Sequence, residues 1–166
     1  MTGNLAIIAL GSNLGDSAAV LHEAIGMLET LAASQFRRSS LWQSTPVDCP
    51  PGSPPFVNAA VALEPAADET PESLLARLQV IEREFGRRPK KILNEPRPLD
   101  LDLIAFGTEI RSTPQLTLPH PRAHLRRFVL EPLNEIVPDL VLPEQSQTIR
   151  QLLAALRNDE IVTRLH

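Results

Sequence analysis

The order of the apolar segments limits the fold of this chain more than any other feature of its sequence. Apolar runs typical of strands occur at residues 4–10, 35–47 and 56–63 and around Asp100. Helical periodicity lies between the first and second runs and again between the third and fourth. The order strand, helix, strand, strand, helix, strand predicts an α+β fold with a ferredoxin-like βαββαβ sheet, mainly antiparallel, and helices on one face.

Capping residues mark where the two central helices begin. Asp16 or Ser17 can accept a hydrogen bond from the free amides at the start of the first helix. Thr70 followed by Pro71 predicts the start of the second, since proline has no amide hydrogen to satisfy, and Gly86 can end it. The apolar positions at helical spacing are Leu21, Ile25 and Leu28 in the first helix and Leu74, Leu78, Ile81 and Phe85 in the second.

Further helices are expected after the Asp100 strand. A short helix near residues 127–136 and a C-terminal helix near 148–157 would cover the other face of the sheet and give a three-layer α/β/α arrangement. The sequence contains no internal repeat, low-complexity tract or linker. We therefore expect a single domain over residues 1–166.

The net charge of −4 is unevenly distributed along the chain. Residues 83–127 carry ten of the sixteen lysines and arginines and five acidic residues, so this span has a charge of +5 and the remainder −9. A basic span around two aspartates suits a small polyanion, whereas an acidic chain with 4% aromatic residues argues against nucleic-acid binding. The single cysteine, Cys49, fits a reducing compartment, and the first apolar run is too short to cross a membrane. These features predict a cytoplasmic protein without a membrane partner.

Two carboxylates stand one residue apart in the apolar stretch "EPRPLDLDLIAFG", residues 95–107. On a strand, residues i and i+2 project to the same side, so Asp100 and Asp102 share a face and lie about 6.5–7 Å apart. Ile104 and Phe106 are expected to continue that face. The opposite face takes Leu99, Leu101 and Leu103.

Carboxylates placed this close together repel each other unless a cation lies between or above them. Oxygen ligands suit Mg²⁺, which commonly takes one or two carboxylates and completes its shell with water and substrate phosphates. The pattern therefore favours a Mg²⁺ site at Asp100 and Asp102. A solvated strand face, or pairing with Arg97, is the alternative that the residues leave open.

Three other features carry polar groups that need an explanation. "ALGSNLGD", residues 9–16, follows a strand but is not followed by the lysine of a phosphate-binding loop, which favours a tight turn. "PHPRAHLRRF", residues 119–128, is either a phosphate-binding loop or a solvent-exposed segment. Asn58 is polar within an apolar strand, so it makes either a structural hydrogen bond or a contact with a bound heterocycle.

Six segments, taken together and in this order, resemble the family of 6-hydroxymethyl-7,8-dihydropterin pyrophosphokinases of folate biosynthesis. They are "ALGSNLGD", "STPV", "FVNAAVALE", "IEREFGR", "PRPLDLDLIAFG" and "LTLPHPRAHLRRFVLEPLNEIVPDL", and they span residues 6 to about 142. The resemblance implies a three-layer ferredoxin-like fold. It also implies an enzyme that moves the β,γ-pyrophosphoryl group of ATP, the co-substrate, onto the hydroxymethyl group of the pterin and releases AMP.

The same resemblance implies roles for individual residues. Two Mg²⁺ ions would be held by Asp100 and Asp102, which would be catalytic together with Arg87 and Arg97. The pterin site would consist of Thr45, Pro46, Asp48, Phe56, Asn58 and Phe128. The ATP site would consist of Gln79, Glu82, Arg87, Arg97, Leu103, Thr117, His120 and Arg126. The expected partners are these small molecules alone, with no nucleic acid or membrane, and the chain is expected to act as a monomer.

The chain departs from the family pattern at two places. Leu93-Asn94-Glu95 stand where the family often has an Arg-Trp pair, and Pro121 replaces an aromatic residue of some members. Two other functions fit the residues: another Mg²⁺-dependent nucleotide enzyme on the same fold, or a ligand-binding ferredoxin-like module.

Overall fold

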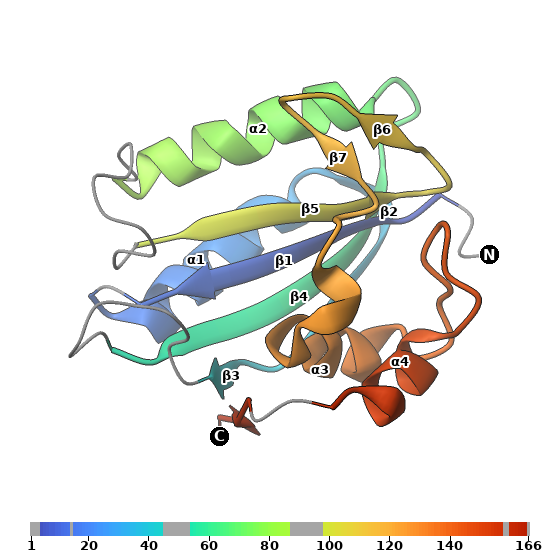
Figure 1. Ribbon diagram of the computed structural model, residues 1–166. Coiled ribbons are helices and arrows are strands. Elements are labelled where there is room, and N and C mark those ends of the chain that lie inside the picture. Colours follow the sequence, from blue (N-terminus) through green and yellow to red (C-terminus); the bar gives the residue numbers. More distant parts are fainter. Residues whose placement is uncertain (1–3, 14, 45–53, 87–97, 158–159, 166) are drawn as a thin grey trace.

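The computed structural model of the chain describes residues 4–13, 15–44, 54–86, 98–157 and 160–165. Within these ranges, a six-stranded sheet lies between helices on both of its faces (Figure 1). The strands of this sheet are β1 (Ala6–Ser12), β2 (Ala32–Arg38), β3 (Trp42–Ser44), β4 (Phe56–Pro65), β5 (Asp100–Phe106) and β8 (Val162–Arg164). The helices are α1 (Ser17–Glu29), α2 (Pro71–Glu84), α3 (Arg127–Ile136) and α4 (Ile149–Ala155).

The strand order explains why the fold is ferredoxin-like. The strands follow each other as β5-β1-β4-β3-β8, β2 also pairs with β4, and all of these pairings are antiparallel. The first and last strands of the βαββαβ unit, β1 and β5, therefore lie side by side, as expected for this arrangement. A separate ribbon of β6 (Arg111–Ser112) and β7 (Thr117–Leu118) and a 3₁₀ turn (Ala123–Leu125) connect β5 to α3.

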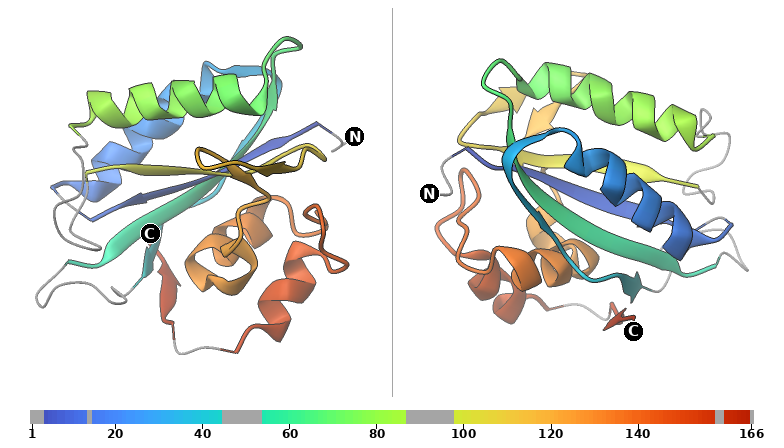
Figure 2. Two further views of the ribbon diagram at one scale, coloured as in Figure 1. Left: turned by 45° about the horizontal axis from the view of Figure 1, so that its top comes forward. Right: turned by 180° about the vertical axis from the view of Figure 1, so that it is seen from behind.

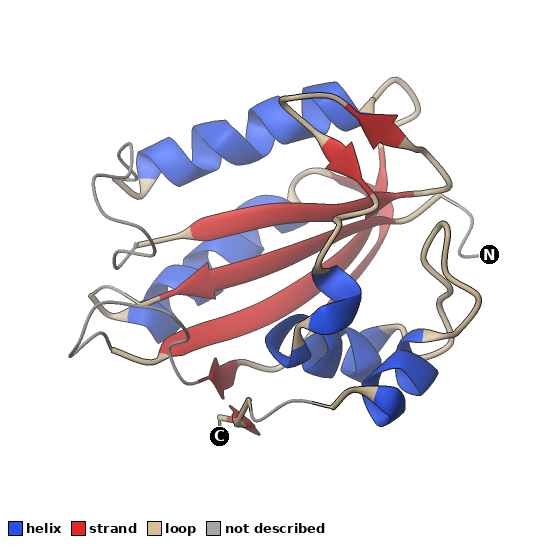
Figure 3. Ribbon diagram, in the orientation of Figure 1, coloured by secondary structure: helices blue, strands red, loops and turns tan. Residues whose placement is uncertain are grey.

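Three layers are present, as the sequence predicts. Figure 2 shows α1 and α2 together on one side of the sheet and α3 and α4 on the other. Buried side chains divide in the same way: Ile8 packs with Leu28 and Leu78 on the first side, and Ile7 packs with Leu130 on the second. Colouring by secondary structure makes the enclosed sheet visible between the two helical layers (Figure 3).

The helices begin where the capping residues predict. Asp16 Oδ1 accepts a hydrogen bond from the Ala19 amide at 3.2 Å. Thr70 and Ser73 form a reciprocal capping box at the start of α2, and Gly86, at φ +83°, follows its last turn. In the part of the chain that the structure describes, no helix is long and apolar enough to cross a membrane.

The expected strand over residues 35–47 is wrong in its extent. The chain forms two strands here, β2 and β3, and residues 45–47 lie outside the described ranges. Between the two strands, the Glu135 carboxylate on α3 accepts hydrogen bonds from the Ser40 amide and hydroxyl. Because these donors bind a helix instead of the neighbouring strand, regular pairing is interrupted.

The position predicted for Phe106 is also wrong. The register between β1 and β5 shifts after Ile8, which pairs with Leu103, to Ile7, which pairs with Ala105. The extra residue, Ile104, creates a β-bulge, and alternation changes beyond it. Phe106 consequently packs on the side of α1 and α2, whereas Ile104 lies on the other side as expected.

Candidate active site

The two aspartates of β5 begin a row of residues that crosses the sheet. Asp100 lies opposite Gly11 on β1, and Gly11 lies opposite Asn58 on β4. Asp102 lies opposite Ala9, whose side chain packs on the layer of α3 and α4. Since directly opposed residues in an antiparallel pair project to the same face, Asp100, Asp102 and Asn58 share the face that α3 and α4 cover in part.

Gly11 separates the carboxylates from Asn58 without a side chain of its own. A Cβ at this position would lie 3.4 Å from Asn58 Nδ2 and 3.7 Å from the Phe56 ring. Glycine therefore leaves room directly beside the Asn58 amide and the Phe56 ring, at the position between Asn58 and Asp100 in the sheet. The sequence interpretation treated this glycine only as part of a turn, although it lies within β1.

Asn58 is held in one orientation by a neighbouring strand. Its side chain is buried, and Oδ1 accepts a hydrogen bond of 2.6 Å from the Ser44 hydroxyl of β3. This bond is the structural alternative that the sequence left open. With Oδ1 fixed by Ser44, Nδ2 is the group that faces Gly11, where it can donate to the edge of a ligand. Sequence reasoning missed Ser44, even though it belongs to the quoted "STPV" segment.

Two aromatic rings belong to the predicted pterin residues. Phe56 is half-buried in β4 and projects to the same face as Asn58, two residues away. Phe128 lies in the first turn of α3, and the Arg126 guanidinium stands 5.6 Å from the centre of its ring. A cation over a ring at this distance is attracted to it and helps to fix both side chains.

The outer edge of β5 is held by groups from two other elements. The buried carboxylate of Glu82, on α2, accepts a hydrogen bond of 2.8 Å from the Leu101 amide. Two residues after Asp102, the Ile104 carbonyl accepts a hydrogen bond of 2.8 Å from the His120 amide. The main chain that carries the aspartates is therefore fixed from the α2 side and from the loop after β7.

His120 stands in a positively charged environment. Burial lowers the pKa of His120 below its usual 6.5, and the charges of Arg126 and Arg122 lower it further, while Asp100 acts in the opposite direction. Its Nδ1 accepts a hydrogen bond from the Arg122 amide at 3.2 Å. The imidazole is consequently neutral at pH 7, with its proton on Nε2, and can donate one hydrogen bond without adding charge.

The remaining residues of the predicted ATP site are spread over several elements. Gln79 is exposed on α2, one turn before Glu82, and Thr117 is exposed in β7. Leu103 is buried among the residues that pack on α1 and α2, so its side chain points away from the aspartate face. Arg87, Arg97, Thr45, Pro46 and Asp48 lie outside the described residues.

The donor set on β5 fits a hard divalent cation. Both aspartates are half-buried and share one face, and carboxylate oxygens are ligands that Mg²⁺ accepts. In the described ranges no group of three or more histidine, cysteine, aspartate or glutamate side chains could hold a metal ion. Two carboxylates leave most of the coordination shell to water and phosphate, which is the usual mode for Mg²⁺ with a nucleotide.

Known proteins are similar to this chain over most of its length. The family described as 7,8-dihydro-6-hydroxymethylpterin-pyrophosphokinase (HPPK) matches residues 7–138. A 2-amino-4-hydroxy-6-hydroxymethyldihydropteridine pyrophosphokinase of Haemophilus influenzae is 39% identical over 158 residues, which are 95% of this chain and 96% of the relative. The enzyme of the same name from Synechocystis is 40% identical over 149 residues, covering 89% of this chain and 74% of the relative.

Solved structures support the fold. Wild-type Plasmodium falciparum HPPK-DHPS with pteroate matches 91% of this chain with a TM-score of 0.70 and 13% sequence identity. A second HPPK-DHPS, in complex with substrates, matches 93% of this chain with the same TM-score and the same identity. This chain spans less than half of either solved chain, 44% and 43% respectively. On the sequence match over most of its length, the chain belongs to the 7,8-dihydro-6-hydroxymethylpterin-pyrophosphokinase family.

Proposed function

We propose that this chain binds its two substrates next to each other along one row of residues. The row runs from Asp102 and Asp100 past Gly11 to Asn58. As a member of its family, the chain is an ATP-dependent diphosphotransferase that transfers the pyrophosphoryl group of ATP to 6-hydroxymethyl-7,8-dihydropterin in folate biosynthesis. The observation that carries the placement is the register of three adjacent strands, which puts two carboxylates and one oriented amide on the same face. Family membership also decides against a ligand-binding module without catalytic activity.

In this proposal the aspartates bind the polyphosphate end of ATP through metal ions. Asp100 and Asp102 would hold two Mg²⁺ ions. When bound, these ions would neutralise part of the negative charge on the phosphates. The half-buried position of both side chains supports this role, because partial exclusion of water strengthens their attraction for a cation.

The pterin is placed at the other end of the row. Asn58 Nδ2 would donate to an acceptor on the ring edge, with its orientation set by Ser44. Phe56 and Phe128 would stack on the flat heterocycle, in keeping with the preference of aromatic rings for offset contacts. We also assign Thr45, Pro46 and Asp48 to this end of the site from the family resemblance.

The reaction needs positioning and charge stabilisation more than covalent chemistry by the protein. The hydroxymethyl oxygen forms a bond to the β-phosphorus, while the bond from that phosphorus to the oxygen bridging to the α-phosphate breaks. The pterin diphosphate and AMP are the products, and the hydroxyl proton is released. Arg126 would stabilise the phosphate charge together with Arg87 and Arg97, and His120 Nε2 can donate a hydrogen bond.

The rest of the ATP site is assigned from the same resemblance. Gln79, Glu82 and Thr117 would line it with their side chains, and Leu103 would contribute its main chain, since its side chain is buried on the opposite face. We further propose that residues 1–166 form one domain that acts as a cytoplasmic monomer on these small molecules, without nucleic acid or membrane. The sheet shared by β1 and β8, from the two ends of the chain, supports a single domain.

The assignment of the aspartates can be tested by measuring AMP release. We expect wild-type protein to form AMP from ATP and Mg²⁺ only when 6-hydroxymethyl-7,8-dihydropterin is present. Asp102→Ala is expected to lower the turnover by at least about 100-fold, because one carboxylate cannot hold the metal-bound polyphosphate in place. Asp68→Ala, at an exposed aspartate between β4 and α2, is the matched control and should retain full activity. Wild-type turnover in Asp102→Ala would contradict the metal assignment.

A further inference from the structure

Glu82 is a charged residue in a position where the helix pattern calls for an apolar one. It follows Leu74 and Leu78 at four-residue spacing on α2, and both of those leucines are buried in the core. Glu82 is 9% exposed, so its carboxylate is removed from most of the solvent. A buried carboxylate is costly unless hydrogen bonds compensate for the lost water. A specific task for this side chain is therefore expected.

Among the described residues, Glu82 forms a hydrogen bond with the main chain between the two aspartates. Oε2 accepts from the amide of Leu101 at 2.8 Å, and both groups are buried. Leu101 pairs with Leu10 of β1, and β5 is the outermost strand on this side among the described strands. An outward amide of an edge strand has no partner within the sheet, and Glu82 supplies one.

A bulge interrupts the pairing of β5 with β1, which makes support from outside the sheet important for the segment before it. Leu103 is the last residue paired with β1 before the bulge at Ile104. Beyond Asp102, the His120 amide binds the Ile104 carbonyl. Within the described residues, the main chain of the aspartate-bearing segment thus has one neighbouring strand on one side. On the other side, single hydrogen bonds link it to the Glu82 carboxylate, which accepts, and to the His120 amide, which donates.

We propose that Glu82 is a positioning residue, which fixes the main chain at Leu101 and thereby sets the direction of the Asp100 and Asp102 carboxylates. It acts through the strand, and this role is separate from any contact with ATP. The inference rests on the proposed role of the two aspartates. It assigns to α2 the task of holding the metal-binding strand in register.

Three variants test the inference. Glu82→Gln keeps an oxygen that can accept from the Leu101 amide, whereas Glu82→Leu has no acceptor but fits the apolar stripe of α2. Glu84→Leu, at an exposed position of the same helix, is the control. Should Glu82→Leu fail to fold, Glu82→Ala removes the same acceptor with a smaller side chain.

Amide hydrogen exchange at Leu101 is the first measurement, made on protein without nucleotide or metal. Loss of the acceptor is expected to speed exchange at this amide by about tenfold or more in Glu82→Leu, while Glu82→Gln and Glu84→Leu stay near wild type. Equal protection of Leu101 in Glu82→Leu and wild type would overturn the inference.

Steady-state kinetics is the second measurement. Misdirected aspartates should lower kcat of Glu82→Leu by about 10- to 100-fold and raise the Mg²⁺ concentration for half-maximal activity, with the KM for the pterin unchanged. Glu82→Gln, which keeps an acceptor for the Leu101 amide, should lower kcat clearly less than Glu82→Leu does. A Glu82→Gln variant as slow as Glu82→Leu, or an effect confined to a substrate KM, would overturn the inference.

Failure of this inference can be distinguished from failure of the proposed function. Full activity in Asp102→Ala would remove the metal role of the aspartates, whatever happens at Glu82. Fast turnover in Glu82→Leu together with an inactive Asp102→Ala would remove only the positioning role.

Discussion

Gly11 shows how the smallest residue shapes the candidate site. It stands in register between Asp100 and Asn58, and a Cβ there would enter the space beside Asn58 Nδ2 and Phe56. The contacts of such a Cβ, 3.4 and 3.7 Å, are ordinary van der Waals distances, so alanine fits the folded protein. The glycine is therefore more important for what binds beside it than for folding.

We expect Gly11→Ala to weaken pterin binding by about tenfold, because the methyl group occupies the room that the ring edge needs next to Asn58. Binding of a non-hydrolysable ATP analogue should change little. Isothermal titration with each ligand gives both values. Gly26→Ala is the matched control, since a Cβ in that part of α1 meets nothing within 4 Å. Unchanged pterin affinity in Gly11→Ala would show that the ring does not lie against β1.

His120 makes the stability of the folded protein depend on pH. Its pKa in the folded protein is lowered, mainly by burial and then by Arg126 and Arg122. As pH falls through 6.5, the unfolded chain takes up a proton at this residue before the folded chain does, so stability is lost below about pH 6.5. Above that value the contribution is constant.

The corresponding experiment compares wild type with His120→Gln, which cannot titrate. The difference in free energy of unfolding, wild type minus variant, should decrease between about pH 7.5 and 5.5. Urea unfolding at several pH values measures it, and the comparison cancels the titration of the other histidines. Parallel stability curves for the two proteins would contradict a lowered pKa.

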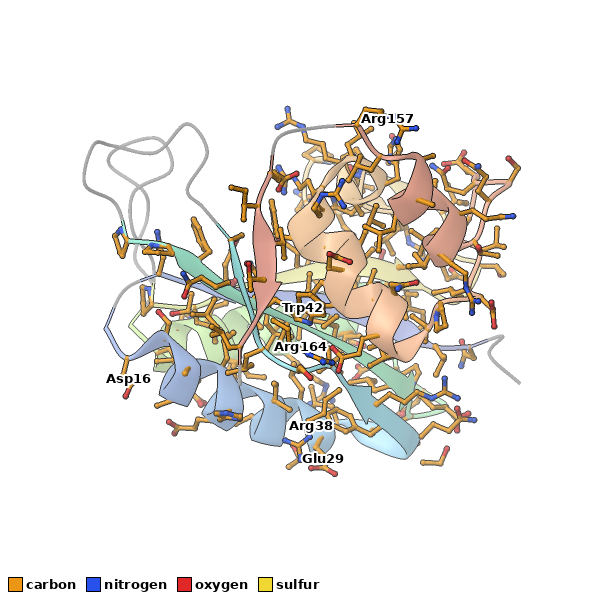
Figure 4. All side chains as sticks on the ribbon, turned by 90° about the horizontal axis from the view of Figure 1, so that it is seen from below. Asp16, Glu29, Arg38, Trp42, Arg157 and Arg164 are labelled. Atoms are coloured by element: carbon orange, nitrogen blue, oxygen red, sulfur yellow. The ribbon has the colours of Figure 1, made fainter. Side chains whose placement is uncertain are left out.

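At the scale of elements, α3 fixes the short strand that orients Asn58. The Glu135 carboxylate accepts from the Ser40 amide, the Ser40 hydroxyl and Trp42 Nε1, at distances between 2.7 and 3.1 Å. Trp42 begins β3, the strand that also carries Ser44. In Figure 4, Trp42 and Arg164 are labelled at the place where β3 pairs with β8. The C-terminal strand thus continues the sheet beside β3.

Glu135→Ala is expected to lower the free energy of unfolding by about 1–3 kcal/mol, because three donors lose a charged acceptor. The single tryptophan, Trp42, reports this directly through its fluorescence during urea unfolding. Glu131→Ala, one turn earlier on α3, is the control for the change in helix propensity. Equal destabilisation by the two variants would show that the contacts of Glu135 contribute nothing specific.

Local signals allowed most elements to be predicted, and long-range contacts explain the errors. Thr70, Pro71 and Gly86 act on their own helix, so the bounds of α2 follow from neighbouring residues. The break between β2 and β3 depends on Glu135, 95 residues after Ser40, and the bulge at Ile104 depends on pairing with β1. No local pattern contains this information, which is also why the partner of Glu82 was missed.

At the scale of the whole molecule, the fold brings together residues from distant parts of the chain. The candidate site draws on β1, β4 and β5 for its row and on α3 for Phe128, with α2 supporting the strand from the other layer. The same-face position of Asp100 and Asp102 followed from their spacing alone, since a strand alternates its side chains. The position of Asn58 relative to them did not, because it requires the strand order β5-β1-β4.

The proposed function depends most on divalent ions that bind to Asp100 and Asp102, at one end of a row that ends at Asn58. Paramagnetic broadening by Mn²⁺, which accepts the same oxygen ligands as Mg²⁺, locates such ions in the amide spectrum of the protein. With a non-hydrolysable ATP analogue present, broadening should be strongest at Asp100 and Asp102, extend to Gly11, and disappear in Asp102→Asn. Broadening centred on other residues, or unchanged in Asp102→Asn, would contradict the account.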